Sequence, residues 1–346
     1  MKSITPHPIP HSQCVPASPT VNAAVNPAVN RRRFTSAAAI ASAVAAVSST
    51  NLAWADEDSD AAGGPAPWLR KSVKLGMIQQ GTMAERFEMA KAAGFAGIEP
   101  NVPVSGDFKG PLLENVTIQE VNRAIKQTGI PVDGTVGGYH WSQRHSDPDP
   151  KVREVAQQKL IRGLRETRAM GGDTMLLVPG HGQDGTEAEV IKRSSEAIRA
   201  ALPVAKELDV KILIENVWNR FLYVHDGPDD QSAKPLADYI DSFESPYVAI
   251  QFDIGNHWKY GDPAKWIRTL GSRIVKLDIK GFSRQKNKFT DITEGDIRWD
   301  EVREALREIG FRGWVAAEVG GGKLQRLTKV AKQMEQALRC NDPVNS

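Results

Sequence analysis

The chain has little cysteine, no strong excess of charge of either sign and no long apolar run after its first 55 residues. It contains two cysteines among 346 residues, and its formal net charge is +2. Without a run of about 18 apolar residues, no membrane span is expected. The near-neutral charge gives no reason to expect nucleic acid or an anionic membrane as a partner. No GxGxxG or GxxxxGK(S/T) pattern follows the first apolar run, which removes the usual mark of a nucleotide-binding doubly wound fold.

The first 55 residues have the layout of an export signal. A charged segment, Arg31, Arg32, Arg33 and Phe34, precedes a mildly apolar Ala/Val/Ile run that ends in Ala-Trp-Ala at 53–55. Paired arginines before such a run resemble the twin-arginine signal, which predicts a periplasmic protein. The alternative is a cytosolic protein with a basic, disordered tail. Such a tail would need neither the Ala/Val run nor the cleavage-like end.

Cleavage after residue 55 would leave 291 of the 346 residues, the usual size of one large α/β barrel domain. Because the removed segment holds Lys2 and three arginines but no acid, the formal charge would move from +2 to −2. Cys14 would be lost, and Cys340 alone could form no intrachain disulfide. Residues 56–70 read as an acidic linker, and residues 71–340 as the catalytic domain.

Short runs rich in β-branched and apolar residues alternate eight times with stretches of helical periodicity. Gly94, Gly129, Gly171 and Gly310 lie just before the next run, where the C-terminal caps of helices belong. This alternation indicates parallel strands joined by crossover helices, and eight units in roughly 270 residues predict a closed (β/α)8 TIM barrel. The predicted strands begin at Val73, Phe95, Val132, Thr174, Val210, Tyr247, Ile274 and Trp314.

The seventh of these runs, IVKLDIKGF from Ile274, places three charges on one face. In a strand, Lys276, Asp278 and Lys280 share a face because side chains alternate with period two. Helices cover every strand of such a barrel, so this face is expected to point inward. Lys276 would lie deeper than Asp278 and offset surplus negative charge, or else extend toward the bottom of the barrel. Lys280 is expected in solvent at the rim.

Acidic residues stand at the ends of four later strands. They are Glu215, Asp253, Asp278 and Glu318, and the chemistry of this fold lies at the carboxyl face of the strands. For any one of them alone, a cap or a salt bridge is an equally good explanation. Four carboxylates aimed at one point would repel each other in a low dielectric. A divalent cation would hold them together.

At these residues the chain resembles the sugar phosphate isomerase/epimerase-like superfamily of xylose isomerase-type barrels. The resemblance covers residues 73–338 and is most specific in IENVWNRFL (214–222), FDIGNHWKYGDPAKWIRTLGSRIVKLDIKGF (252–282), EGDIRWDEVREAL (294–306) and GWVAAEVGGG (313–322). It implies Glu215, Asp253 and Glu318 as metal ligands, with Asp278 where the family has His or Gln. An all-carboxylate site favours Mn²⁺ or Mg²⁺ over Zn²⁺.

The implied activity is that of a sugar isomerase or epimerase. Glu215 and Glu318 would remove and return a proton beside a carbonyl, and the metal would stabilise the resulting enediolate. In the epimerases a His commonly follows the strand-six Asp by three residues, whereas here Asn256 occupies that position and His257 comes next. Asp296 is expected to cap the helix that begins near Arg298. The predicted substrate-binding residues, for which ordinary rim polarity or loop packing is the alternative, are Glu99, His140, Trp141, His181, Asn256, His257 and Arg284.

Three other functions remain open at this point. An exported lyase or hydrolase acting on 3-keto-glycosides would use the same metal and the same proton removal, and a carbohydrate-binding barrel would use no catalysis at all. An apurinic endonuclease is disfavoured because its trinuclear zinc site needs many histidines, and only five follow residue 55. The expected partner is a small carbohydrate. The sequence leaves open whether the protein forms a homo-oligomer.

Overall fold

The computed structural model describes residues 67–103 and 115–342. The predicted signal at 1–55 and most of the predicted linker lie outside the described residues. Export therefore stays a prediction.

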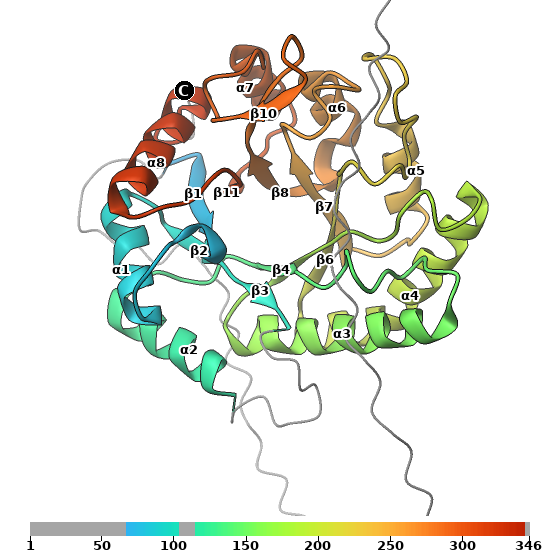
Figure 1. Ribbon diagram of the computed structural model, residues 1–346, viewed down its shortest axis with the longest axis horizontal. Helices are drawn as coiled ribbons and strands as arrows, with labels where there is room; N and C mark the ends of the chain where they lie inside the picture. Colours follow the sequence, from blue (N-terminus) through green and yellow to red (C-terminus); the bar gives the residue numbers. More distant parts are fainter. Residues whose placement is uncertain (1–66, 104–114, 343–346) are drawn as a thin grey trace, which may run out of the picture. The chain divides into compact units, whose positions relative to one another are not determined.

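A parallel sheet that closes into a barrel forms the centre of the structure (Figure 1). The strand order is β2-β1-β11-β8-β7-β6-β5-β4-β3. Because only Pro100 separates β2 from β3, the two ends of this order belong to one strand position, and the barrel has eight positions. The strands are β1 (Leu69–Lys74), β2 (Gly97–Glu99), β3 (Asn101–Val102), β4 (Thr135–Gly137), β5 (Thr174–Leu177), β6 (Lys211–Glu215), β7 (Val248–Asp253), β8 (Ile274–Ile279) and β11 (Gly313–Ala317).

Helices surround the barrel, and their buried faces cover the strands (Figure 1). Thr82 and Thr186 begin two of them with capping boxes to Glu85 and Glu189. None of the helices among the described residues is long and apolar enough to span a membrane. They are α1 (Met83–Ala93), α2 (Val116–Thr128), α3 (Pro150–Ala169), α4 (Glu187–Leu208), α5 (Lys234–Asp241), α6 (Pro263–Leu270), α7 (Trp299–Glu308) and α8 (Leu324–Leu338), with 3-10 turns at Leu75–Met77 and Gly271–Arg273.

The predicted (β/α)8 barrel is confirmed, and its four predicted cap glycines all have positive φ angles of 93, 74, 83 and 66°. The first strand was placed too late. It runs from Leu69 to Lys74 because it pairs with β11 from Gly313 to Ala317, and the chain turns into a 3-10 helix directly after it.

An antiparallel hairpin of β9 (Gly281–Ser283) and β10 (Lys288–Thr290) follows β8. Asp296 was expected to cap α7, but it stabilises the hairpin instead. Its carboxylate accepts hydrogen bonds from Ser283 Oγ and Arg284 N, and α7 begins without a side-chain cap.

A buried histidine anchors the loop that follows β4. His145 is fully buried, and its Nε2 lies 3.1 Å from the Tyr139 hydroxyl. Burial lowers the pKa of His145 to about 4, whereas an unfolded chain protonates histidine near pH 6.5. The contribution of the neutral ring to stability is therefore complete above pH 6.5 and is lost as the pH falls toward 4.

We expect the His145→Gln variant to lose this pH dependence. Between pH 6.5 and pH 4.5, its free energy of unfolding should fall less steeply than that of the wild type, by about 1.4 kcal/mol per pH unit. Urea denaturation at a series of pH values measures the two slopes. Parallel profiles for the two proteins would show that His145 becomes protonated in the folded state.

Candidate active site

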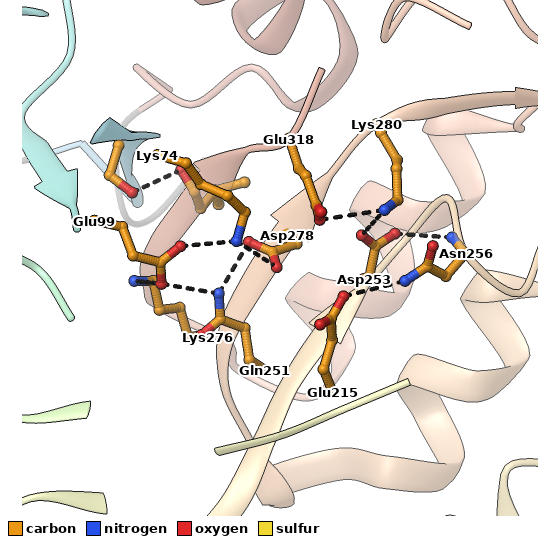
Figure 2. Close-up of polar contacts among 12 residues, drawn as sticks. Lys74, Glu99, Glu215, Gln251, Asp253, Asn256, Lys276, Asp278, Lys280 and Glu318 are labelled. Carbon is orange, nitrogen blue, oxygen red and sulfur yellow. Dashed lines mark hydrogen bonds and ion pairs between the residues drawn. The ribbon is translucent and has the colours of Figure 1, made fainter. Parts of the chain in front are cut away.

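Four carboxylates meet at the carboxyl ends of the barrel strands. Glu215 ends β6, Asp253 ends β7, Asp278 lies near the end of β8, and Glu318 follows β11. Each offers one oxygen atom, and these atoms all lie within 4.8 Å of one another. Figure 2 shows the four side chains turned toward a common space. Three of the residues are buried, while Glu318 keeps 37% of its side chain exposed.

Strand pairing produces this convergence. Asp253 and Asp278 are Cα partners in the pairing of β7 with β8. Glu215 pairs with Gln251, two residues before Asp253 on the same strand face. Beyond β11, the backbone N–H of Glu318 donates to the Ile279 carbonyl at 3.0 Å. The register of three strand pairs therefore sets the positions of all four acids.

Two asparagines fix Glu215 and Asp253 in place. Asn216 holds the Asp253 backbone at both its N–H (2.7 Å) and its carbonyl (2.9 Å). Asp253 Oδ1 accepts from the backbone N–H groups of Gly255 and Asn256, both at 2.8 Å. Asn256 Nδ2 donates to Glu215 Oε1 at 3.1 Å. Asp253 Oδ2, which is buried, accepts no backbone bond and is instead reached by the Lys280 ammonium at 3.0 Å.

Two lysines enter the acid cluster from opposite sides. Lys74 Nζ lies 2.8 Å from Glu99 Oε2 and 3.0 Å from Asp278 Oδ2. Lys280 Nζ lies 3.0 Å from Asp253 Oδ2 and 3.2 Å from Glu318 Oε2. The expectation that Lys280 reaches solvent was wrong, because its side chain is only 12% exposed. The nearby carboxylates compensate for the cost of burying its charge.

Lys276 and Glu99 form a second, deeper group of charges. Lys276 Nζ pairs with Glu99 Oε1 at 2.5 Å and with Asp133 Oδ2 at 2.7 Å, and all three side chains are at most 1% exposed. Gln251 Nε2 donates to both Glu99 Oε1 (3.1 Å) and Asp278 Oδ1 (2.9 Å). Glu99 is thus no rim residue open to substrate. It links the interior charges to the acid cluster (Figure 2).

Burial and mutual repulsion change the acidity of the cluster. Burial, opposed by Lys74, raises the pKa of Asp278 to about 7. Burial likewise raises the pKa of Asp253 to about 6, against the effect of Lys280. The pKa of Glu215 is also raised, by burial and then by Glu318. Burial also favours a higher pKa for Glu318, but Lys74 and Lys280 outweigh it and lower the pKa of this carboxyl.

The acid cluster fits a divalent cation. Oxygen ligands on opposite sides of the ion are about 4.2 Å apart for Mg²⁺ and about 4.6–5.2 Å apart for Ca²⁺. The four oxygens, all within 4.8 Å of one another, therefore match the larger ion as they stand and Mg²⁺ after a small contraction. With all four carboxylates ionised, as a bound cation would favour, the acids and the two lysines carry a formal net charge of −2. The buried Asp253 Oδ2 and Glu318 Oε2 have an ion pair to Lys280 but no well-directed hydrogen bond. An all-oxygen donor set suits Mg²⁺, Ca²⁺ or Mn²⁺.

A cavity of about 420 Å³ opens above the acid cluster, within the range typical of small-molecule sites. Glu215 and Glu318 contribute to its wall, as do Lys74, Lys280 and Asn256. The other lining residues are Asn101, Val136, Gly138, His140, Trp141, Val217, Trp218 and Phe289.

His140 and Trp141 lie in this cavity, as their predicted role requires. His140 is buried, and burial lowers its pKa to about 3, so the ring is neutral. Its Nδ1 accepts from Val178 N at 3.3 Å, which assigns the proton to Nε2. Trp141 packs edge-on against His140 and is 54% exposed. The pair offers one hydrogen-bond donor and one aromatic face.

Three other predicted substrate-binding residues lie outside this cavity. His181 Nδ1 accepts from Gln183 N at 3.1 Å. His257 is buried, with its ring edge-on to Trp266 at 4.5 Å between centroids. Arg284 stacks over Trp258 at 3.7 Å and donates to backbone carbonyls of the loops that follow β6 and β7.

Three residues of the site were not predicted from the sequence: Lys74, Gln251 and Phe289. Lys74 ends its strand as the four acids end theirs, so the same rule would have found it had β1 been placed correctly. Gln251 lies two residues before Asp253, on the same face of the strand. No local pattern marks Phe289, because its position beside the cavity depends on the pairing of β10 with β9.

Comparison with known proteins identifies the family. A family model described as xylose isomerase-like TIM barrel matches residues 87–340. A putative L-ribulose-5-phosphate 3-epimerase from Haemophilus influenzae is 24% identical over 292 residues, which cover 77% of this chain and 98% of that protein. An uncharacterized protein from Methanocaldococcus jannaschii is 25% identical over 174 residues, which cover 49% of this chain and 58% of that protein.

Solved structures show the same fold at low identity. A 3-keto-D-glucoside 4-epimerase from E. coli has a TM-score of 0.62 and 18% identity, covering 79% of this chain and 99% of that chain. A D-tagatose 3-epimerase-like protein has a TM-score of 0.64 and 17% identity, covering 78% and 97%. The family model spans the strands that carry all four clustered acids, and the chain belongs to the xylose isomerase-like TIM barrel family.

Proposed function

We propose that the protein is a divalent-metal-dependent sugar epimerase or isomerase that removes a proton from the carbon beside a carbonyl. The observation that carries this proposal is the convergence of four carboxylate oxygens within 4.8 Å of one another, beside a cavity that Glu215 and Glu318 line. Three of the similar proteins described above carry the word epimerase in their names, which supports the same class of reaction. When bound, the cation supplies electrostatic stabilisation for the negative charge that develops on the substrate oxygens.

The two glutamates provide the proton transfer. Glu318 is the more exposed of the two, and Glu215 enters the same cavity from β6. For epimerisation, Glu318 takes the proton from carbon, and the C–H electrons move toward the carbonyl oxygen. A protonated Glu215 then returns a proton to the opposite face as the carbonyl re-forms, whereas a single glutamate acting twice gives aldose–ketose exchange.

The remaining lining residues hold the substrate. The neutral His140 presents Nε2–H to a substrate oxygen. Trp141 and Trp218 offer aromatic surfaces on which the C–H groups of a sugar ring can lie. Asn256 orients Glu215 through its 3.1 Å hydrogen bond.

Metal binding is tested by thermal unfolding of chelator-treated protein. We expect Mn²⁺ or Mg²⁺ to raise the melting temperature, since a ligand at 100 times its Kd stabilises by about 2.7 kcal/mol. The Asp253→Asn variant should lose this response, because the substitution removes a negatively charged metal ligand. Its amide oxygen can still accept the backbone hydrogen bonds of Gly255 and Asn256, so the fold should be kept.

The matched control is Asp238→Asn, which alters an exposed carboxylate paired with Lys234 and should keep the metal response. Absence of metal-dependent stabilisation in the wild type would contradict the proposal. Turnover is tested by NMR in D₂O with ketoses and 3-keto-glycosides. An epimerase exchanges one hydrogen with solvent and does not cleave its substrate. A lyase also removes a proton but releases a leaving group, which appears as a second product.

A further inference from the structure

A second cavity adjoins the first beside Glu318. Its volume is about 530 Å³, and Lys280, Phe289 and Glu318 line both cavities. Thr290, Asp291, Val319 and Gly320 complete its wall. Even without the first cavity, the second is large enough to be a small-molecule site. Because the two cavities meet at Glu318, a ligand reacting there can extend into both.

Phe289 stands at the junction of the two cavities and is held there by its neighbours. Its ring centroid lies 4.9 Å from that of Trp218 and 5.3 Å from that of Phe282. Lys280 Nζ lies 5.0 Å from the same centroid. Despite these contacts the residue is 45% exposed. An exposed aromatic face fixed between two cavities is a surface on which the C–H groups of a second ring can stack.

The charges around the second cavity suit hydroxyl groups better than anions. Its carboxylates are those of Glu318 and Asp291. Lys280, the one cation among its lining residues, already pairs with Asp253 and Glu318. Arg326 and Lys329 bind Asp291. Carboxylates accept strong hydrogen bonds from hydroxyl groups, whereas a phosphate here would meet like charge.

We propose that the second cavity is a subsite for a neutral second sugar ring, so that the substrate is a glycoside of at least two rings. The inference rests on the proposed function, because the reacting ring must lie in the first cavity beside Glu215 and Glu318. The second cavity would bind the ring of the substrate that does not react. Binding energy from this remote ring would improve kcat/KM for the two-ring substrate.

Gly320 allows the second cavity to be filled selectively. It lines only the second cavity, and a Cβ added to it meets no atom within 4 Å. A Gly320→Leu side chain can therefore enter the cavity without displacing the backbone. Gly76 is the matched control, since a Cβ there also meets nothing within 4 Å and the residue lines neither cavity.

The test compares three probes: the 3-keto forms of methyl β-D-glucoside, cellobiose and glucose 1-phosphate, each with the ketone on the ring that is to react. In the wild type, we expect kcat/KM for solvent proton exchange to be at least tenfold higher for the two-ring probe than for the methyl glycoside. The 1-phosphate, whose charge would enter the second cavity, should be no better than the methyl glycoside. Gly320→Leu should remove the two-ring advantage and leave the methyl glycoside within about twofold, while Gly76→Leu should change neither.

Equal kcat/KM for the one-ring and two-ring probes, or a two-ring advantage that survives Gly320→Leu, overturns the subsite and leaves the proposed function intact. A preference for the 1-phosphate overturns it as well. Failure of the metal-bound wild type to bind any probe by calorimetry or to exchange a proton overturns the proposed function together with the subsite.

Discussion

Glu318→Gln is expected to lower turnover by about 10²- to 10⁴-fold, the usual contribution of a positioned general base. The amide has nearly the same shape as the carboxylate but cannot take a proton from carbon. Glu318 already lines the cavity and is 37% exposed, so the substitution creates no void. Lys280 keeps Asp253 at 3.0 Å when its 3.2 Å ion pair with Glu318 is lost, so the loss should cost little stability. Initial rates and thermal unfolding of the same preparation separate the two effects.

Glu294→Gln provides the matched control. Glu294 is 58% exposed, pairs with Lys329 and lines neither of the two cavities that meet at Glu318. It should retain the turnover of the wild type. If Glu318→Gln turns over substrate at the control rate, Glu318 is not the base. If it unfolds at a much lower temperature than the control, the loss of rate is structural.

Periodicity and helix signals were sufficient to predict the barrel. Eight alternating units and the cap glycines are local features, and the structure contains them. The first strand was misplaced because its limits depend on pairing with β11, more than 200 residues away. The β9–β10 hairpin was missed for a different reason. Its strands have three residues each, too short for a repeat of two to be recognised.

The four clustered acids could be predicted because each ends its own strand, and strand ends converge in a closed barrel. The two lysines that contact them, Lys74 and Lys280, could not. Lys74 meets Glu99 through the pairing of β1 with β2, in which the two residues are Cα partners. Lys280 turns back toward Asp253 instead of reaching solvent. Both contacts depend on the conformer that each lysine side chain adopts to offset a buried charge. No pattern in the sequence indicates that conformer.

Lys276→Met should destabilise the barrel by about 3–5 kcal/mol, the usual cost of removing one partner from a buried ion pair. Lys276 is the fully buried partner of Glu99 at 2.5 Å and of Asp133 at 2.7 Å. Glu99 would keep Lys74, but no other salt bridge reaches Asp133 among the described residues. Met has a similar length and shape, so the loss would come from charge and not from a cavity. Urea denaturation measures the change in the free energy of unfolding.

The sign of the pH dependence separates this explanation from a packing defect. Burial already raises the pKa of Asp133, against the effect of Lys276, so the variant should raise it further above the unfolded value of about 3.9. Protonation of Asp133 then relieves the unpaired charge. The variant's deficit in stability should therefore shrink as the pH falls from 8 to 5. Asp133→Asn in the Lys276→Met background should recover part of the loss at pH 8, because it removes the same charge. A deficit that is equal at both pH values and unaffected by Asp133→Asn would attribute the loss to packing.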